Sequence, residues 1–193
     1  MPPKIKITEE AILDTAVRIT AEQGIEKLNA RSLAKELNCS VQPIFRVYSS
    51  MEDLKKAVIV RVGEIYSRYL SDSISQEDGL VGLEMAYIHF AQEQKHLFRL
   101  LHMSDRLGLN KTEEFTKVGI NREIVMAMAQ MTGLTPEQSA MLYTGAFFTA
   151  HGIASMIATN HCSFQEAEIQ EIMKNVFEGL ILKLRSEEAD PKV

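Results

Sequence analysis

Apolar side chains recur at intervals of three and four residues along most of the chain, and no stretch alternates apolar with polar residues. Such spacing gathers the apolar residues on one face of a helix, whereas alternation is typical of a half-buried strand. The pattern therefore predicts an all-α fold. Its clearest helices cover residues 8–23, 51–70, 95–103, 136–160 and 164–185, and apolar stripes at 83–94 and 120–132 indicate two more.

Signals that start and stop helices crowd into the stretch after residue 28. Asn29 is a good N-cap, because its side chain can accept a hydrogen bond from a free N–H in the first turn. Asn38 tolerates the left-handed conformation that ends a helix, and Ser40 is then placed to cap a helix that starts at Val41. Pro43 is compatible with that helix because a first-turn N–H has no intrahelical partner. These residues predict two short helices separated by a tight turn.

Ser49 and Ser50 each stand three residues before an acid, so they form two overlapping capping boxes for a longer helix. That helix continues to about residue 70, which is too far for it to belong only to a small N-terminal unit. We therefore expect a three-helix domain at 1–50, a connector helix at 51–70, and a second helical domain at 71–193.

The last two predicted helices are apolar over more than one face. Gly145, Thr149 and Gly152 keep one stripe of the first of them small, which lets another helix approach closely. A helix that is apolar nearly all round must be buried on all sides, and a second subunit supplies that burial most simply. We therefore expect a homodimer formed through these two helices.

Composition and charge place the protein among ordinary globular proteins. Its 193 residues are 46% hydrophobic and 24% charged, with a formal net charge of −5. Residues 1–56 hold nine Lys or Arg against eight Asp or Glu, so that part is about +1 and the remainder about −6. Charge is expected to interrupt each apolar run before it reaches bilayer length, and the N-terminus lacks a secretion signal. These features predict a cytoplasmic protein with no membrane partner, in which Cys39 and Cys162 are small buried hydrophobes.

Motifs of catalysis are missing from the sequence. It has no phosphate loop, no nucleophile elbow and no metal-ligand spacing, and the GLVG at 79–82 follows no strand. His161 and Cys162 are two soft ligands at a helix end, and a structural role is the stronger interpretation. The sequence predicts no enzymatic activity, no cofactor and no metal site.

An apolar binding pocket is a better candidate. The chain has ten methionines, and Met adapts to ligands of different shape because it is unbranched. The predicted pocket residues are Tyr87, Phe90, Phe98, His102, Met128, Phe147 and His151. For any one of them, ordinary core packing is the alternative, since aromatic and Met stripes at helical spacing usually pack against each other.

Residues 8 to 60 resemble the DNA-binding domain of the TetR family of bacterial transcriptional regulators. The resemblance rests on the order and spacing of Gly24, Leu33-Ala34, Pro43-Ile44-Phe45, Tyr48 and Glu52-Asp53-Leu54. It implies a helix-turn-helix DNA-binding domain followed by a helical ligand-binding and dimerisation domain, with about nine helices in all. The predicted DNA-binding residues are Arg31, Ser40, Val41, Gln42, Pro43, Phe45, Arg46 and Lys55.

Three positions depart from the family pattern. Phe45, Val47 and Met51 stand where the family commonly has polar groups that contact phosphates. Two functions therefore remain open. The first is a homodimeric repressor that binds a palindromic operator in double-stranded DNA and is released by a small apolar or amphipathic effector. The alternative is an all-helical ligand-binding or scaffold protein with weak or lost DNA binding.

Overall fold

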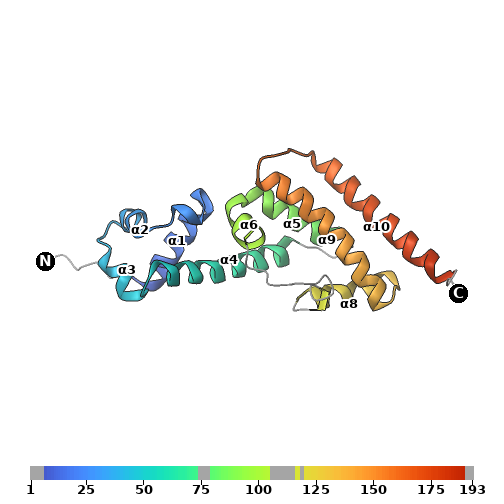
Figure 1. The fold of residues 1–193 in the computed structure, drawn as a ribbon, viewed down its shortest axis with the longest axis horizontal. Coiled ribbons are helices and arrows are strands. Elements are labelled where there is room, and N and C mark those ends of the chain that lie inside the picture. Colours follow the sequence, from blue (N-terminus) through green and yellow to red (C-terminus); the bar gives the residue numbers. More distant parts are fainter. Residues whose placement is uncertain (1–6, 74–78, 105–115, 118–119, 190–193) are drawn as a thin grey trace. The chain divides into compact units, whose positions relative to one another are not determined.

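The computed structural model describes residues 7–73, 79–104, 116–117 and 120–189. Within these ranges the structure is helical and contains no strand, which confirms the predicted all-α fold class (Figure 1). The predicted break in helical pattern at 105–111 lies outside the described residues.

The described residues form two compact units. The first unit is drawn from Met1–Tyr69 and Glu93–Ser104, and the second from Leu70–Gln92 and Asp105–Val193. The helix α6 (Lys95–His102) packs on α1 (Glu9–Gln23), so it belongs to the first unit. In the domain division predicted from the sequence, this helix falls within the second domain at 71–193.

The first two helices of the first unit have the caps that the sequence predicts. Its elements are α1 (Glu9–Gln23), the 3₁₀ turn η1 (Ile25–Lys27), α2 (Ala30–Glu36), α3 (Gln42–Val47) and most of α4 (Met51–Ser73). The hydroxyl of Thr8 accepts a hydrogen bond from the Ala11 N–H at 3.1 Å and caps α1. The Asn29 side chain caps α2, and Asn38 takes the left-handed conformation with φ of 49°.

The start of α3 differs from the prediction. Val41, and not Ser40, is the N-cap residue, and it makes no side-chain capping bond. The reason is that Val41 is already helical, with φ of −70° and ψ of −18°, and its carbonyl accepts from the N–H groups of Ile44 and Phe45. Ser40 therefore lies one residue too early to cap, whereas Pro43 falls in the first turn as expected.

The second unit consists of α5 (Gly82–Glu93), α8 (Ile120–Thr132), α9 (Pro136–Ala158) and α10 (Glu166–Ala189). The orange α9 and red α10 lie side by side in Figure 1, and α9 also packs on α8. The predicted close approach occurs at Gly145, where an added Cβ would stand 2.7 Å from Cδ1 of Leu180 on α10. A glycine at this position lets the two helices pack in contact.

By length and composition alone, α9 could cross a membrane, and it is the one helix among the described residues that could. The expectation that charge interrupts each apolar run is wrong for α9, because no Asp, Glu, Lys or Arg occurs between Glu137 and Glu166. The fold gives another reason for this composition: α9 packs on two helices and buries Leu142, Ala146 and Ile153. The core helix of a globular protein has the same composition.

The two cysteines are not buried, contrary to the prediction. Cys39 is half-buried in the turn after α2, and Cys162 is exposed between α9 and α10. Both are free thiols.

Candidate functional site

The outward face of α3 is unusually apolar for a surface. Ile44 is fully buried and Tyr48 is 8% exposed, so one side of α3 is anchored in the core of the first unit. The opposite side presents large side chains to solvent, with Phe45 at 46% exposure. We call this the α3 face, and it consists of Val41, Gln42, Phe45 and Arg46, all of which are exposed.

Cations on or near the α3 face are not neutralised by the protein. Among the described residues, Arg31, Arg46 and Lys55 form no ion pair, while other arginines of the same unit do. Arg18 donates to Glu36 at 2.7 Å, and this guanidinium lowers the pKa of the Glu36 carboxyl. Arg61 likewise donates to Asp14 at 3.0 Å. Glu36 and Asp14 are thus ion-paired with arginines other than Arg31 and Arg46.

The predicted DNA-binding residues differ in their exposure. Arg31 is exposed in the first turn of α2, and Ser40 is exposed just before α3. Pro43 and Lys55 are half-buried. Together with the α3 face, these residues offer an amide that can pair with a base edge, apolar groups that suit a thymine methyl, and cations that suit phosphates.

A second candidate site lies in the second unit, where α5 faces α9. The Tyr87 hydroxyl and Nδ1 of His151 are hydrogen-bonded at 2.8 Å, and burial lowers the pKa of His151. The Phe147 ring stacks on the His151 ring with centroids 5.9 Å apart, and its centroid is 5.3 Å from that of Tyr87. We call this group the α5–α9 seam. It unites three residues of the predicted pocket.

The other four predicted pocket residues are distributed over both units. Phe90 and Met128 are buried in the second unit, at 0% and 4% exposure. Phe98 and His102 belong to α6 in the first unit, where their ring centroids are 5.0 Å apart. The His102 ring also meets Tyr66 of α4 edge to face, at 4.9 Å.

Sequence reasoning missed Tyr143 and Glu84, which we add to the α5–α9 seam. The Tyr143 ring lies against that of Phe147 with centroids 5.9 Å apart, and the Glu84 charge acts on Tyr143. Glu84 is 2% exposed, neither of its carboxylate oxygens has a hydrogen-bond partner, and burial raises its pKa to about 8. Burial, and to a lesser degree the charge of Glu84, raises the pKa of Tyr143. The Tyr143 hydroxyl donates to Oδ1 of Asn121 at 2.9 Å. One signal was available: Glu84 is the single Asp, Glu, Lys or Arg between Gly82 and Glu93, and it stands three residues before Tyr87.

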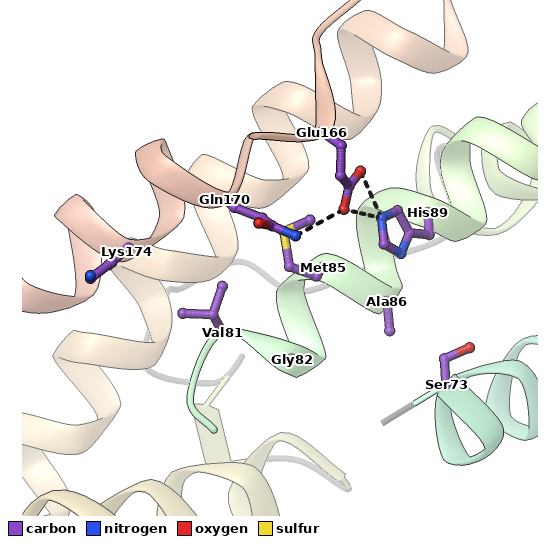
Figure 2. Close-up of a pocket in the computed structure, with 9 residues that line it drawn as sticks. All are labelled: Ser73, Val81, Gly82, Met85, Ala86, His89, Glu166, Gln170 and Lys174. Carbon is purple, nitrogen blue, oxygen red and sulfur yellow. Dashed lines mark hydrogen bonds and ion pairs between the residues drawn. The ribbon is translucent and has the colours of Figure 1, made fainter. Parts of the chain in front are cut away.

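Two hollows in the described part of the second unit are lined by other residues than the seam. Figure 2 shows the first, of about 330 Å³, where His89 of α5 and Glu166 of α10 point toward one another. Nε2 of His89 is 2.9 Å and 3.0 Å from the two carboxylate oxygens, and the Gln170 amide donates to one of them at 3.3 Å. These polar groups satisfy one another, so this hollow is the weaker ligand candidate. The second is an open groove of about 1010 Å³ whose lining includes Met126 of α8 and Met141 of α9.

Comparison with known proteins supports the helix-turn-helix interpretation. Residues 12–58 match the family model described as bacterial regulatory proteins, tetR family. The chain is similar to an uncharacterized HTH-type transcriptional regulator, YobS, of Bacillus subtilis (strain 168), with 22% identity over 194 residues that cover 94% of this chain and 97% of that protein. Its fold is similar to the crystal structure of a TetR-like transcriptional regulator from Rhodococcus sp. RHA1, with a TM-score of 0.58 and 14% identity, covering 92% of this chain and 96% of that one.

These observations define the class of protein. An all-helical chain that carries a helix-turn-helix near its N-terminus, and that matches the family model there, is a DNA-binding transcriptional regulator. Residues 12–58 carry the DNA-binding domain of the tetR family, and the whole chain is similar to regulators of that type.

Proposed function

We propose that this regulator is a repressor that binds a palindromic operator as a homodimer and leaves it when a small effector binds. The α3 face carries this proposal. A helix of six residues that is anchored by the buried Ile44 exposes Gln42, Phe45 and Arg46 together. Unpaired cations favour contact with the phosphates of DNA. Exposed apolar groups beside them can contact the methyl groups of thymine, and they mark this face as a binding surface.

Base reading falls to the start of α3. In helix-turn-helix docking, the first turn of the recognition helix reaches base edges in the major groove. Val41, Gln42 and Pro43 occupy that turn. The Gln42 amide can pair bidentately with adenine, while the two apolar neighbours suit a thymine methyl. Arg31, Arg46 and Lys55 then contact phosphates, which adds affinity without sequence preference.

Exposed apolar residues of α9 and α10 support the homodimer. On α9, Met141, Phe148 and Met156 are 57%, 55% and 39% exposed, and their spacing of seven and eight residues keeps them on one helix face. On α10, Ile172 and Leu182 are 37% and 69% exposed. A second copy of the chain would cover these residues, and two recognition helices held about 34 to 36 Å apart match one turn of DNA.

Effector release follows from linkage. A ligand that binds the free dimer better than the DNA-bound dimer weakens DNA binding by the same factor by which DNA weakens ligand binding. The α5–α9 seam is the proposed place for this ligand, because aromatic rings and polar groups converge there. A His151→Trp variant that fills the seam is expected to bind DNA and to lose its response.

A gel-shift assay with the DNA upstream of the protein's own gene tests the DNA-binding part. The full chain should shift this fragment in preference to scrambled DNA of equal length, and Gln42→Ala should reduce the preference. Gln130→Ala, an exposed amide of α8, is the matched control and should leave it unchanged. Equal affinity for both fragments would favour the alternative, a ligand-binding or scaffold protein, to which the exposed Phe45 and Val47 would also be suited.

A further inference from the structure

Glu84 is a buried acid of the second unit that makes no side-chain hydrogen bond. Its side chain is 2% exposed, and its two carboxylate oxygens have no hydrogen-bond partner. No Lys, Arg or His of the described residues forms an ion pair with it. A buried polar group without a partner destabilises a fold. A ligand that pairs with Glu84 would explain why the protein keeps a carboxyl at this position.

Aromatic residues of α5 and α9 lie near Glu84. Glu84 and Tyr87 are one turn apart on α5, and Tyr143 of α9 is close enough for the Glu84 charge to act on its hydroxyl. The Tyr87 ring is next to that of Phe147, with centroids 5.3 Å apart, and the Phe147 ring is next to that of His151, with centroids 5.9 Å apart. The faces of Tyr and Phe rings attract cations, and an adjacent carboxylate adds a full negative charge.

We propose that Glu84 anchors the effector, and that the effector carries a cationic nitrogen, an ammonium or an amidinium, on an apolar or aromatic body. This inference rests on the proposed ligand-responsive function and names the ligand class of the same seam. The nitrogen pairs with the Glu84 carboxylate, and its apolar body lies along the rings of Tyr87, Tyr143 and Phe147.

The protonation of Glu84 makes this pairing dependent on pH. Burial raises the pKa of the empty site to about 8, so at neutral pH the carboxyl is mostly protonated and a bound cation must displace its proton to solvent. The titratable group that its charge reaches is Tyr143 of α9, which donates to Asn121 of α8. The other titratable groups of the seam are Tyr87 of its own helix and His151 of α9, which are bonded to each other. Burial lowers the pKa of His151 and raises that of Tyr143, so both stay neutral as Glu84 ionises between pH 6.5 and 8.

Calorimetry on the full chain tests the proposal with two probes of similar size. Trimethyl(3-phenylpropyl)ammonium has a charge that does not depend on pH, and 3-phenylpropan-1-ol is its neutral counterpart. At pH 8 the ammonium should bind at least ten times more tightly than the alcohol. Its affinity should rise roughly tenfold between pH 6.5 and 8, because the ionised fraction of a carboxyl with a pKa near 8 rises by about that factor.

Glu84→Gln keeps the size of the side chain and removes the charge. This variant should bind both probes alike and show no rise with pH, while circular dichroism confirms that it is folded. Glu93→Gln, an exposed acid at the end of the same helix, should behave as the parent. Equal binding of the two probes by the parent protein, or a preference for the ammonium that survives in Glu84→Gln, would show that Glu84 is not the anchor.

A gel shift with the upstream DNA, with and without the ammonium probe, separates this inference from the proposed function. Binding through Glu84 that leaves DNA affinity unchanged supports the cation site and contradicts effector release at the seam. Release of DNA by neutral apolar compounds, with no preference for the ammonium, supports effector release and overturns the cation site.

Discussion

The α3 face and the α5–α9 seam break the usual distribution of polar and apolar groups in opposite ways. The α3 face exposes apolar side chains, with Phe45 at 46% and Val41 at 37% exposure, beside a cation that has no partner among the described residues. The seam buries an acid, Glu84, at 2% exposure with no partner for its oxygens. Neither arrangement is what folding alone would select.

The two regions differ in how much their unusual side chains reduce the stability of the fold. Scattered apolar groups on a surface have little effect on stability, so the α3 face can be altered without loss of the fold. A buried carboxyl without a partner destabilises the protein, so removing it should stabilise the fold while a ligand function is lost. A site such as the α3 face is found by looking for exposed apolar side chains. A site such as the α5–α9 seam is found by looking for buried polar atoms that lack a hydrogen-bond partner.

Neighbouring residues of α3 give the largest expected contrast. Ile44→Ala should lower the free energy of unfolding by about 2–5 kcal/mol, because it removes a fully buried side chain and leaves a cavity. Phe45→Ala should change it by no more than about 0.5 kcal/mol, because the ring is exposed, but should reduce DNA affinity. Urea unfolding measures the first effect and gel shift the second. A loss of stability in Phe45→Ala comparable to that in Ile44→Ala would mean that α3 has no free face.

Replacing the buried acid should have the opposite sign. Glu84→Met keeps the length of the side chain, and it should raise the free energy of unfolding at pH 8 by about 1–3 kcal/mol because an unpaired polar group is removed. The pKa of Glu84 is raised from 4.5 to about 8, so the folded protein holds a proton that the unfolded chain releases. The stability that this group contributes therefore falls as pH rises from about 4.5 to about 8.

Unfolding midpoints measured across that pH window should show the fall in the parent protein and its absence in Glu84→Met. The gap between the two proteins should consequently widen toward pH 8. A constant gap at all pH values would mean that Glu84 has a normal pKa and is solvated in the folded protein.

The start of α3 should control which base pair is preferred. Gln42→Ala should cost about 1–3 kcal/mol of discrimination at one base pair, because one bidentate contact is lost. Competition binding with single-base operator variants measures it. If Gln42→Ala weakens binding to specific and random DNA equally, the Gln42 amide does not read a base.

The smallest effect concerns charge alone. Arg46→Ala should reduce the slope of log affinity against log salt by about one and weaken binding to all sequences alike. Lys174→Ala, an exposed cation of α10, is the matched control and should leave the slope unchanged. An unaltered slope in Arg46→Ala would mean that this guanidinium faces solvent in the DNA complex.

Most of the fold could be predicted from the sequence, because caps and periodicity act locally. Thr8, Asn29 and Asn38 have the conformations that their chemistry predicts, and the ends of α9 and α10 fall within a few residues of those expected. Ser40 failed as a cap because α3 begins at Gln42, one residue later than the pattern suggested, with Val41 as its N-cap residue. Capping patterns in the sequence do not determine the first residue of a helix to better than one or two positions.

The seam could be predicted only in part, because its members come from distant segments. Tyr87, Phe147 and His151 were found through aromatic chemistry, but nothing in the sequence shows that a given aromatic residue faces another helix and not its own core. Glu84 was missed because an acid inside a helical pattern normally faces water, and its burial depends on how α5 packs. Conversely, Phe98 and His102 share the same chemistry yet belong to the first unit.

The placement of α6 also decides how the protein can be cut. The chain leaves the first unit after Tyr69, returns to it at Glu93 and leaves it again after Ser104. A fragment that ends at Tyr69 would keep every residue of the helix-turn-helix but would lack α6, the helix that packs on α1. That fragment would expose the part of α1 that α6 covers. A stable isolated DNA-binding fragment would therefore have to include residues 93–104, either by extending the chain through them or by rejoining them with a short linker.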